Sequence, residues 1–262
     1  MRASLPMYDR PATKDANQRF WGLIRRHLQE VGIDAPAQLS TDAEGAEFWT
    51  AKDMVFSQTC GMPYRTTLHG KVKIVGTPDY GIENCPPGYY RSVLIKHKDD
   101  PRSSLYDFSG TRVAVNGFNS QSGFAALANA INNTETRFSH CIVTGAHANS
   151  VAAVASGKAD IAAIDIVTWR LLAREKDVTE DVEVFAQTDP TPGLPFICNI
   201  NICAQTVFMA VADAITALSE NDRELLMLRD IVWIDHDAYM SVPTPARKEQ
   251  DLLPIRNPGL PS

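Results

Sequence analysis

Between residues 116 and 123 the chain reads Asn-Gly-Phe-Asn-Ser-Gln-Ser-Gly, a polar turn that joins an expected strand to an expected helix. The β-branched residues within 112–115 predict a short buried strand, and apolar residues spaced i, i+3, i+4 and i+7 after Gly123 predict a helix. A helix start presents unpaired backbone N–H groups and the positive end of the helix dipole. Together with the hydroxyl groups of Ser120 and Ser122, such a helix start is a suitable binding site for an anion. The same residues also suit an ordinary serine N-cap, and this stretch alone leaves both interpretations open.

In open α/β sheets ligands bind beyond the carboxyl ends of strands, so polar residues at those ends are further candidates. Those in this chain are Tyr8 with Asp9, the turn 58–64 that ends in Tyr64, His147 at a helix start, and Asp165 at the end of an apolar strand.

Each of these residues also has a purely structural interpretation. Tyr8 and Tyr64 are candidates for interfacial aromatic residues, and His147 for a surface or capping residue. Asp165 lies between two isoleucines and suits a helix N-cap, a buried charge partner or a ligand acceptor. Cys60 lacks an identified neighbouring base, so we do not assign it as a nucleophile.

The elements that must position these residues form two α/β series. The first has strands expected at 2–8, 53–57 and 71–75, with a helix at 20–31 that Gly32 ends. Its β-α-β-α-β order predicts a parallel sheet. The second has strands expected at 112–115, 141–143, 159–164 and 182–186, with a helix at 148–156. We therefore expect a discontinuous first lobe of residues 1–88 and 190–262, and a second lobe of residues 89–189.

Composition excludes several classes of protein. The net charge of −6 argues against a nucleic-acid partner, and no apolar run is long enough to cross a bilayer. Five cysteines without a CxxC pair and histidines without ligand spacing predict neither a metal site nor a cofactor. The N-terminus lacks an apolar leader region, so we expect a cytoplasmic protein as the chain is written, and a periplasmic one if a leader has been removed.

Taken together, four segments resemble a known family: Asn119–Gly123 at a helix start, Thr144-Gly-Ala-His147, Val151–Asp165 with its Gly-Lys-Ala-Asp turn, and Thr188–Gly193. The chain resembles the phosphate, phosphite and phosphonate substrate-binding proteins of ABC importers. That resemblance implies the type II periplasmic binding-protein fold, in which two Rossmann-like α/β lobes enclose a ligand cleft.

The resemblance implies ligand-binding roles for seven residues: Tyr8, Tyr64, Ser120, Gln121, Ser122, His147 and Asp165. The three helix-start residues would grip the oxyanion, the histidine would donate from the same lobe, and the two tyrosines from the other. Asp165 matches a position where the family reads an amine or a protonated oxygen. Gln121 replaces the small hydroxyl residue usual in the family, which leaves the size and identity of the ligand open.

We therefore expect a solute-binding protein for a small oxyanion, phosphate- or phosphonate-like, without catalytic activity and without membrane insertion. Closure of two lobes would bury the ligand, and the resemblance implies an ABC permease as a partner. The alternative is a cytosolic enzyme or ligand sensor on the same fold that acts on a small organic ligand. The enzyme would use His147 with Asp165 or Cys60.

Overall fold

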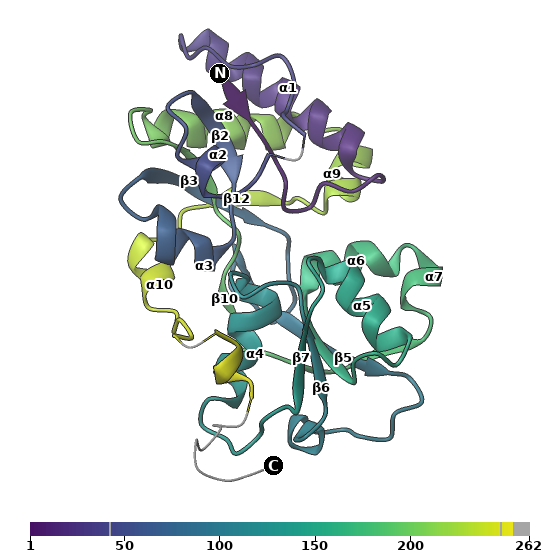
Figure 1. Cartoon of the computed structure of the whole chain (residues 1–262). Helices are drawn as coiled ribbons and strands as arrows, with labels where there is room; N and C mark the ends of the chain where they lie inside the picture. The colour runs from purple at the N-terminus through teal and green to yellow at the C-terminus, as the bar shows by residue number, and fades with distance from the viewer. Residues whose placement is uncertain (42, 247, 254–262) are drawn as a thin grey trace. The chain divides into compact units, whose positions relative to one another are not determined.

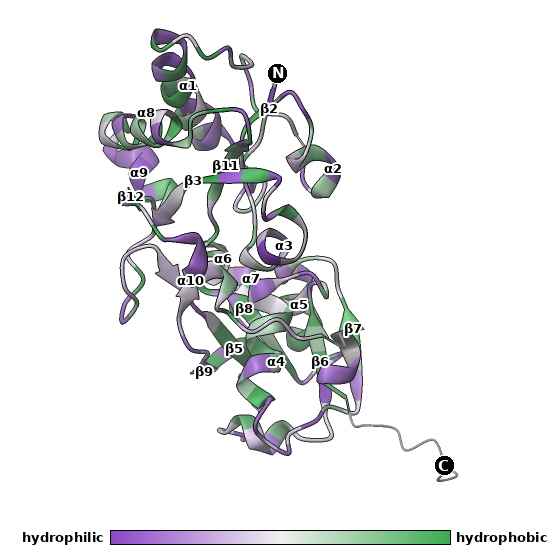
Figure 2. Cartoon of the chain, turned by 90° about the vertical axis from the view of Figure 1, so that its left-hand side faces the viewer, coloured by the Kyte–Doolittle hydropathy of each residue, from purple (hydrophilic) through white to green (hydrophobic). Residues whose placement is uncertain are grey.

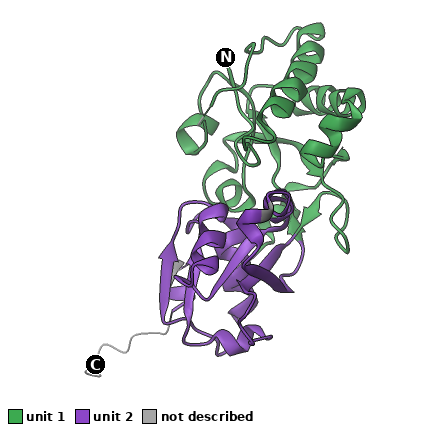
Figure 3. Ribbon diagram, turned by 90° about the vertical axis from the view of Figure 1, so that its right-hand side faces the viewer, with its two compact units in different colours: residues 1–90, 191–242 green, residues 91–190, 243–262 purple. Residues whose placement is uncertain are grey.

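The computed structural model describes residues 1–41, 43–246 and 248–253. They form two compact units (Figure 3). Unit 1 contains Met1–Tyr90 and Thr191–Val242, and unit 2 contains Arg91–Pro190 and the described residues from Pro243 onward. The chain therefore passes between the units three times, as the colours of Figure 1 allow the reader to follow.

The C-terminal segment departs from the expected lobe division. Residues from 243 onward were expected in the first lobe, but those that the structure describes, 243–246 and 248–253, belong to unit 2. The Asn129 side-chain amide donates to the carbonyl oxygen of Pro243 at 3.0 Å, and the Phe138 N–H donates to that of Leu252 at 2.9 Å. Leu252 is fully buried. A proline-rich tail has no periodicity that could have indicated this attachment.

Unit 1 contains a five-stranded sheet with the order β1-β2-β11-β3-β12. Its strands are β1 (Arg2–Ala3), β2 (Met54–Gln58), β11 (Phe196–Asn199), β3 (Val72–Asp79) and β12 (Asp230–Val232). β1 is parallel to β2, and β11 is antiparallel to both β2 and β3, so β2 and β3 run in the same direction. The three strands of the first series therefore run in the same direction, as expected, but the sheet is mixed because the antiparallel strands β11 and β12 complete it. β11, which follows the return of the chain to unit 1 at Thr191, lies between β2 and β3.

Both faces of this sheet are covered. Phe196 and Cys198 of β11 belong to one core cluster, and Ile197 belongs to the other, because successive strand residues point to opposite faces. Helix α1 (Lys14–Glu30) packs with α8 (Ala204–Ala217) in the first cluster, and α1 carries both apolar and polar residues in Figure 2. The other helices of the unit are α2 (Ala46–Trp49), α3 (Gly61–Pro63) with the π-helical turn Tyr64–Leu68, α9 (Glu220–Leu226) and α10 (His236–Met240).

Gly22 within α1 and Gly32 just after it give a matched test of the helix backbone. Gly22 lies within the helix, and a Cβ atom added there meets nothing within 4 Å. We expect Gly22→Ala to raise the free energy of unfolding by about 0.5–1 kcal/mol. Gly32 follows the helix with a φ of 77°, as its expected role as the stop requires, so Gly32→Ala should destabilise instead. Urea unfolding of both variants checks this, and a loss of stability in Gly22→Ala would contradict it.

Unit 2 contains a second five-stranded sheet with the order β7-β6-β8-β5-β9. Its strands are β7 (His140–Val143), β6 (Arg112–Val115), β8 (Ile161–Asp165), β5 (Ser92–His97) and β9 (Val182–Gln187). β6 is parallel to β7 and β8, whereas β5 is antiparallel to β8 and β9. The strands expected at 112–115, 141–143, 159–164 and 182–186 are confirmed within two residues at each end.

The helices of unit 2 follow its strands. They are α4 (Ala126–Ile131), which continues the π-helical turn Gln121–Ala125, α5 (His147–Ala155), α6 (Ile166–Ala173), α7 (Lys176–Thr179) and the 3₁₀ turns Leu105–Phe108 and Lys248–Asp251. The helix after β6 and the helix after β7 begin where the expected site residues lie.

A small two-stranded ladder in unit 1, β4 (Tyr89–Tyr90) with β10 (Thr191–Pro192), joins the two segments of that unit.

Candidate functional site

The carboxyl ends of three strands of unit 2 meet at one edge of its sheet, because β6 is parallel to both β7 and β8. The chain leaves β6 toward Ser120 and leaves β7 toward His147, and β8 ends at Asp165. The antiparallel strand β5 begins at the same edge, where Ser92 lies opposite Asp165. This edge therefore gathers the unit 2 residues that the sequence singled out.

The helix start at this edge is N-capped by Ser120. Its backbone is extended, with φ −86° and ψ 129°, and its Oγ accepts a hydrogen bond from the N–H of Gly123 at 3.0 Å. The helix runs without a break through residues 121–131, and its first five residues are π-helical, a geometry frequent at functional sites. Ser120, Gln121 and Ser122 are all buried. The N-cap interpretation of Ser120 is thus confirmed.

A serine–histidine pair connects this helix to α5. Ser122 Oγ lies 2.9 Å from Nε2 of His147, the first residue of α5. Nδ1 of the same imidazole is buried and has no hydrogen-bond partner. Burial lowers the pKa of His147 to about 4, so the imidazole is neutral at neutral pH. A neutral imidazole offers one N–H donor and one acceptor nitrogen.

The lowered pKa of His147 makes the stability of the protein depend on pH. Its pKa falls from 6.5 in the unfolded chain to about 4 in the folded protein, so between these values the unfolded chain binds more protons. We therefore expect the free energy of unfolding to fall as the pH decreases from 6.5 toward 4. His147→Gln should remove this part of the dependence in urea titrations at several pH values, whereas His140→Gln, at an exposed position of β7, should preserve it. An unchanged profile in His147→Gln would contradict the assignment.

Asp165 is buried and caps α6, because its carboxylate accepts the N–H of Thr168 at 2.9 Å. Of the three interpretations drawn from the sequence, the helix N-cap is therefore confirmed.

Two residues at this edge, Ser92 and Thr188, were not among the candidates from sequence. Ser92 Oγ donates to the carbonyl oxygen of Ser122 at 2.9 Å, and the Ser92 N–H donates to Thr188 Oγ1 at 3.0 Å. Ser92 was missed because its position depends on the antiparallel register of β5. Thr188 begins a segment that carried the family resemblance, which was the available signal.

Tyr8 and Tyr64 both lie in unit 1, in different surroundings. The Tyr8 ring contacts that of Tyr80 edge-on at 5.2 Å. Tyr64 is buried, and its ring makes edge contacts with Tyr239 at 5.5 Å and with His69 at 6.2 Å. Burial, and next the charge of Asp235, raises the pKa of the Tyr64 hydroxyl, which therefore stays protonated and able to donate.

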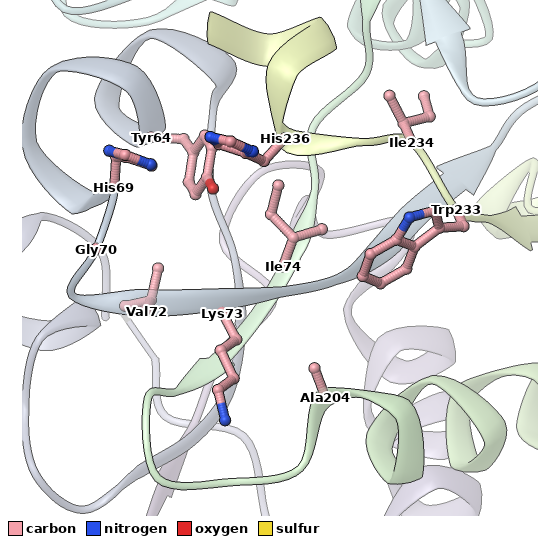
Figure 4. A pocket seen from close by; sticks show the side chains of 10 residues that line it. All are labelled: Tyr64, His69, Gly70, Val72, Lys73, Ile74, Ala204, Trp233, Ile234 and His236. Carbon is pink, nitrogen blue, oxygen red and sulfur yellow. The ribbon is translucent and has the colours of Figure 1, made fainter.

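Tyr64 also lines a pocket of about 350 Å³ on unit 1 (Figure 4). The rings of His69 and His236 stack in its wall, with centroids 5.0 Å apart and planes 6° from parallel. The pocket is lined by Tyr64, His69, Gly70, Val72, Lys73, Ile74, Ala204, Trp233, Ile234 and His236. The Lys73 ammonium group is held by the carbonyl oxygen of Ile202 at 3.0 Å.

Near this pocket, Asp235, His236 and Asp237 hold potential metal-ligand atoms within 4.8 Å of one another. Their arrangement has a structural explanation without an ion. Asp235 caps α10 by accepting the N–H of Asp237, and His236 Nδ1 lies 3.2 Å from an oxygen of Asp237.

The pair Ser122 and His147 has the residue types of a catalytic nucleophile and its base. In such sites a third group, commonly a carboxylate, orients the histidine through its second nitrogen. Here Nδ1 of His147 has no hydrogen-bond partner, and the low pKa makes the imidazole a weak base. The alternative that pairs His147 with Asp165 would need the carboxylate to bond to Nδ1, and Nδ1 has no partner.

Two α/β units, one of them with a capped helix start and hydroxyl donors at the carboxyl edge of its sheet, define a solute-binding fold. A family model described as "ABC transporter, phosphonate, periplasmic substrate-binding protein" matches residues 8–239, and the chain belongs to this family. The family consists of substrate-binding proteins of ABC transporters and not of enzymes, which confirms the expected solute-binding role for phosphonate-like ligands. A search of the curated proteins found no match.

Several solved structures are similar to this chain. A Xanthomonas citri protein bound to ATP has a TM-score of 0.69 at 14% identity and covers 96% of this chain and 94% of its own. PhnD1 from Prochlorococcus marinus in complex with methylphosphonate has a TM-score of 0.68 at 14% identity, with 91% and 94% covered. A binding protein component of an ABC phosphonate transporter from Pseudomonas aeruginosa has a TM-score of 0.65 at 16% identity, with 91% and 82% covered.

These likenesses confirm the expected two-lobe type II periplasmic binding-protein fold. In the described part of the chain, no helix has the length and apolar character needed to span a membrane.

Proposed function

We propose that unit 2 binds a phosphonate-like oxyanion at the start of the helix 121–131. The proposal rests on one observation above all. Ser122 Oγ lies 2.9 Å from Nε2 of a half-buried, neutral His147, and Ser122 is two residues from the N-cap Ser120. The hydroxyl groups of Ser120 and Ser122 and the N–H groups of the first helical turn are donors, which an anion requires and a cation would avoid.

The electrostatics of the edge are compatible with this role. The whole chain carries a net charge of −6, so long-range attraction cannot hold the ligand. Charge-assisted hydrogen bonds are stronger than neutral ones, and a desolvated site strengthens them further. A local cluster of donors can therefore bind an anion against the global charge.

A thermal-shift screen tests the proposal. It compares phosphate, phosphite, methylphosphonate, 2-aminoethylphosphonate, sulfate and acetate. A ligand at about a hundred times its Kd should add roughly 2.7 kcal/mol of stability, which is several degrees for a chain of this size. We expect the largest rise with a phosphorus oxyanion. A rise with acetate alone, or with none of the six compounds, would contradict the proposal.

The remaining predicted site residues belong to the same proposal. We infer that Tyr8 and Tyr64 contribute hydroxyl donors to the ligand, and that Asp165 recognises an amine or a protonated oxygen of the ligand. Gln121, buried between the two serines, would set the size of the ligand. Affinity measurements on Tyr8→Phe, Tyr64→Phe and Asp165→Asn, each against methylphosphonate and 2-aminoethylphosphonate, separate these roles.

The family description supports an ABC permease as the partner and the periplasm as the place of action. A permease encoded beside this chain, reconstituted in vesicles, would take up phosphonate only when the binding protein is added. Uptake that is independent of the binding protein would contradict the partnership.

A further inference from the structure

Asn116 follows β6 immediately before the turn to the proposed site. A Cβ atom added at Gly123 would lie only 1.8 Å from Asn116 Oδ1 and 3.1 Å from His147 Cε1. Asn116 Oδ1 and His147 Cε1 are therefore at most 4.9 Å apart, the sum of these two distances. The absent side chain at Gly123 thus allows the Asn116 amide to approach the imidazole of His147.

Two buried polar atoms at this point have no partner: Asn116 Oδ1 and His147 Nδ1. Nδ1 is bonded directly to Cε1, so the two unpartnered atoms lie in the same buried region beside Gly123, and a small movement of the Asn116 side chain is needed to bring them into contact. A buried polar atom without a hydrogen bond destabilises the folded protein, because the atom has lost its contacts with water and gained none in return. One contact between these two side chains would satisfy both groups.

The direction of that contact decides what Ser122 can do. If Asn116 presents its oxygen, His147 carries its hydrogen on Nδ1, and Nε2 becomes an acceptor that takes the Ser122 hydroxyl hydrogen. If the amide is turned by about 180°, its N–H donates to Nδ1 and the hydrogen lies on Nε2. Nε2 then donates to Ser122 Oγ, and the hydroxyl hydrogen of Ser122 is left for an anion. Turning the Asn116 amide also moves Oδ1 away from the buried position in which it has no hydrogen-bond partner.

We propose that Asn116 is a positioning residue of the anion site: its side-chain N–H donates to His147 Nδ1, fixes the Nε2–H tautomer and so directs the Ser122 hydroxyl hydrogen to the oxyanion. This inference rests on the proposed function. The hydrogen of one ring nitrogen in a buried histidine is commonly set by the bond that the other nitrogen makes. An asparagine can play this part because its amide donates, whereas a carboxylate could only accept.

The test is the tautomer of His147, read from ¹⁵N and ¹³C chemical shifts of protein labelled in histidine, with His147→Gln used to assign the signal. In the wild-type protein, free of ligand, we expect the Nε2–H tautomer. In Asn116→Asp the carboxylate should accept from Nδ1 and shift the ring to the Nδ1–H tautomer. The affinity for methylphosphonate should fall by on the order of tenfold or more. Losses of this size are typical when a residue that bonds to the second ring nitrogen of a metal-binding histidine is replaced.

Asn133→Asp makes the same change of charge at an exposed position of unit 2 and should alter neither the tautomer nor the affinity. The Nδ1–H tautomer in the wild-type protein would overturn the inference without any variant having to fold. So would an unchanged tautomer in a folded Asn116→Asp protein. Because the tautomer is read without ligand, these outcomes are distinct from failure of the proposed function, in which the wild-type protein binds no oxyanion.

Discussion

Alanine at both Ser120 and Ser122 is expected to weaken the binding of methylphosphonate by a few kcal/mol, given about 1.5–3 kcal/mol for each hydrogen bond to a charged group. That corresponds to a loss of affinity of roughly a hundredfold or more. Both hydroxyl groups lie at the helix start, and Ser120 also accepts the N–H of Gly123. Isothermal titration calorimetry with methylphosphonate measures the effect.

The control for this double variant is Ser139→Ala with Ser156→Ala. It removes two hydroxyl groups from exposed positions of unit 2, where they donate only to the backbone carbonyl oxygens of Thr111 and of residues 152 and 153. Its affinity should match that of the wild-type protein. Loss of the Ser120 N-cap is expected to lower stability by about 1 kcal/mol, so the titration is done well below the melting temperature. Equal affinities in the two double variants would remove the helix start from the site.

Gly123→Ala is expected to disrupt the same site by a steric route. The added Cβ would lie 1.8 Å from Asn116 Oδ1 and 3.1 Å from His147 Cε1. Asn116 would have to move, and overpacking of this kind typically costs about 1–3 kcal/mol of stability. Because His147 and the helix start would shift with it, binding of methylphosphonate should fall by on the order of tenfold or more.

Gly22→Ala is the matched control for this second variant, since it adds the same methyl group to open space on α1. Calorimetry and thermal unfolding of both variants separate the two effects. A Gly123→Ala protein with the stability and affinity of the wild type would show that the crowding around Gly123 has no consequence for the site.

The helix start could be predicted from sequence because every signal for it is local. A β-branched strand, a turn of N-cap residues and an apolar face with helical spacing follow one another between residues 112 and 131. The structure has β6, the Ser120 cap and the helix in these places. Even so, sequence could not indicate the π-helical first turn, which depends on packing.

Other features could not be predicted because they depend on pairing between distant residues. β11 has three apolar residues followed by Asn199 and comes directly after Pro195, so it is too short for periodicity to separate it from a loop. Strand pairing in the sheet of unit 1 sets the place of β11 between β2 and β3. Strand pairing in the sheet of unit 2 sets the position of Ser92 opposite Asp165. The contact of Ser92 with Ser122 follows from that register. The approach of Asn116 to His147 depends on packing across Gly123, which no local pattern indicates.

The most direct measurement of the central claim is a titration of ¹⁵N-labelled protein with methylphosphonate, followed through its backbone amide signals. An oxyanion held at the start of the helix 121–131 should shift the amide signals of Ser122, Gly123 and His147 with one saturable curve. The double variant Ser120→Ala with Ser122→Ala should show no such curve over the same concentrations. Saturable binding that leaves these three signals unmoved would contradict the account and place the ligand elsewhere on the protein.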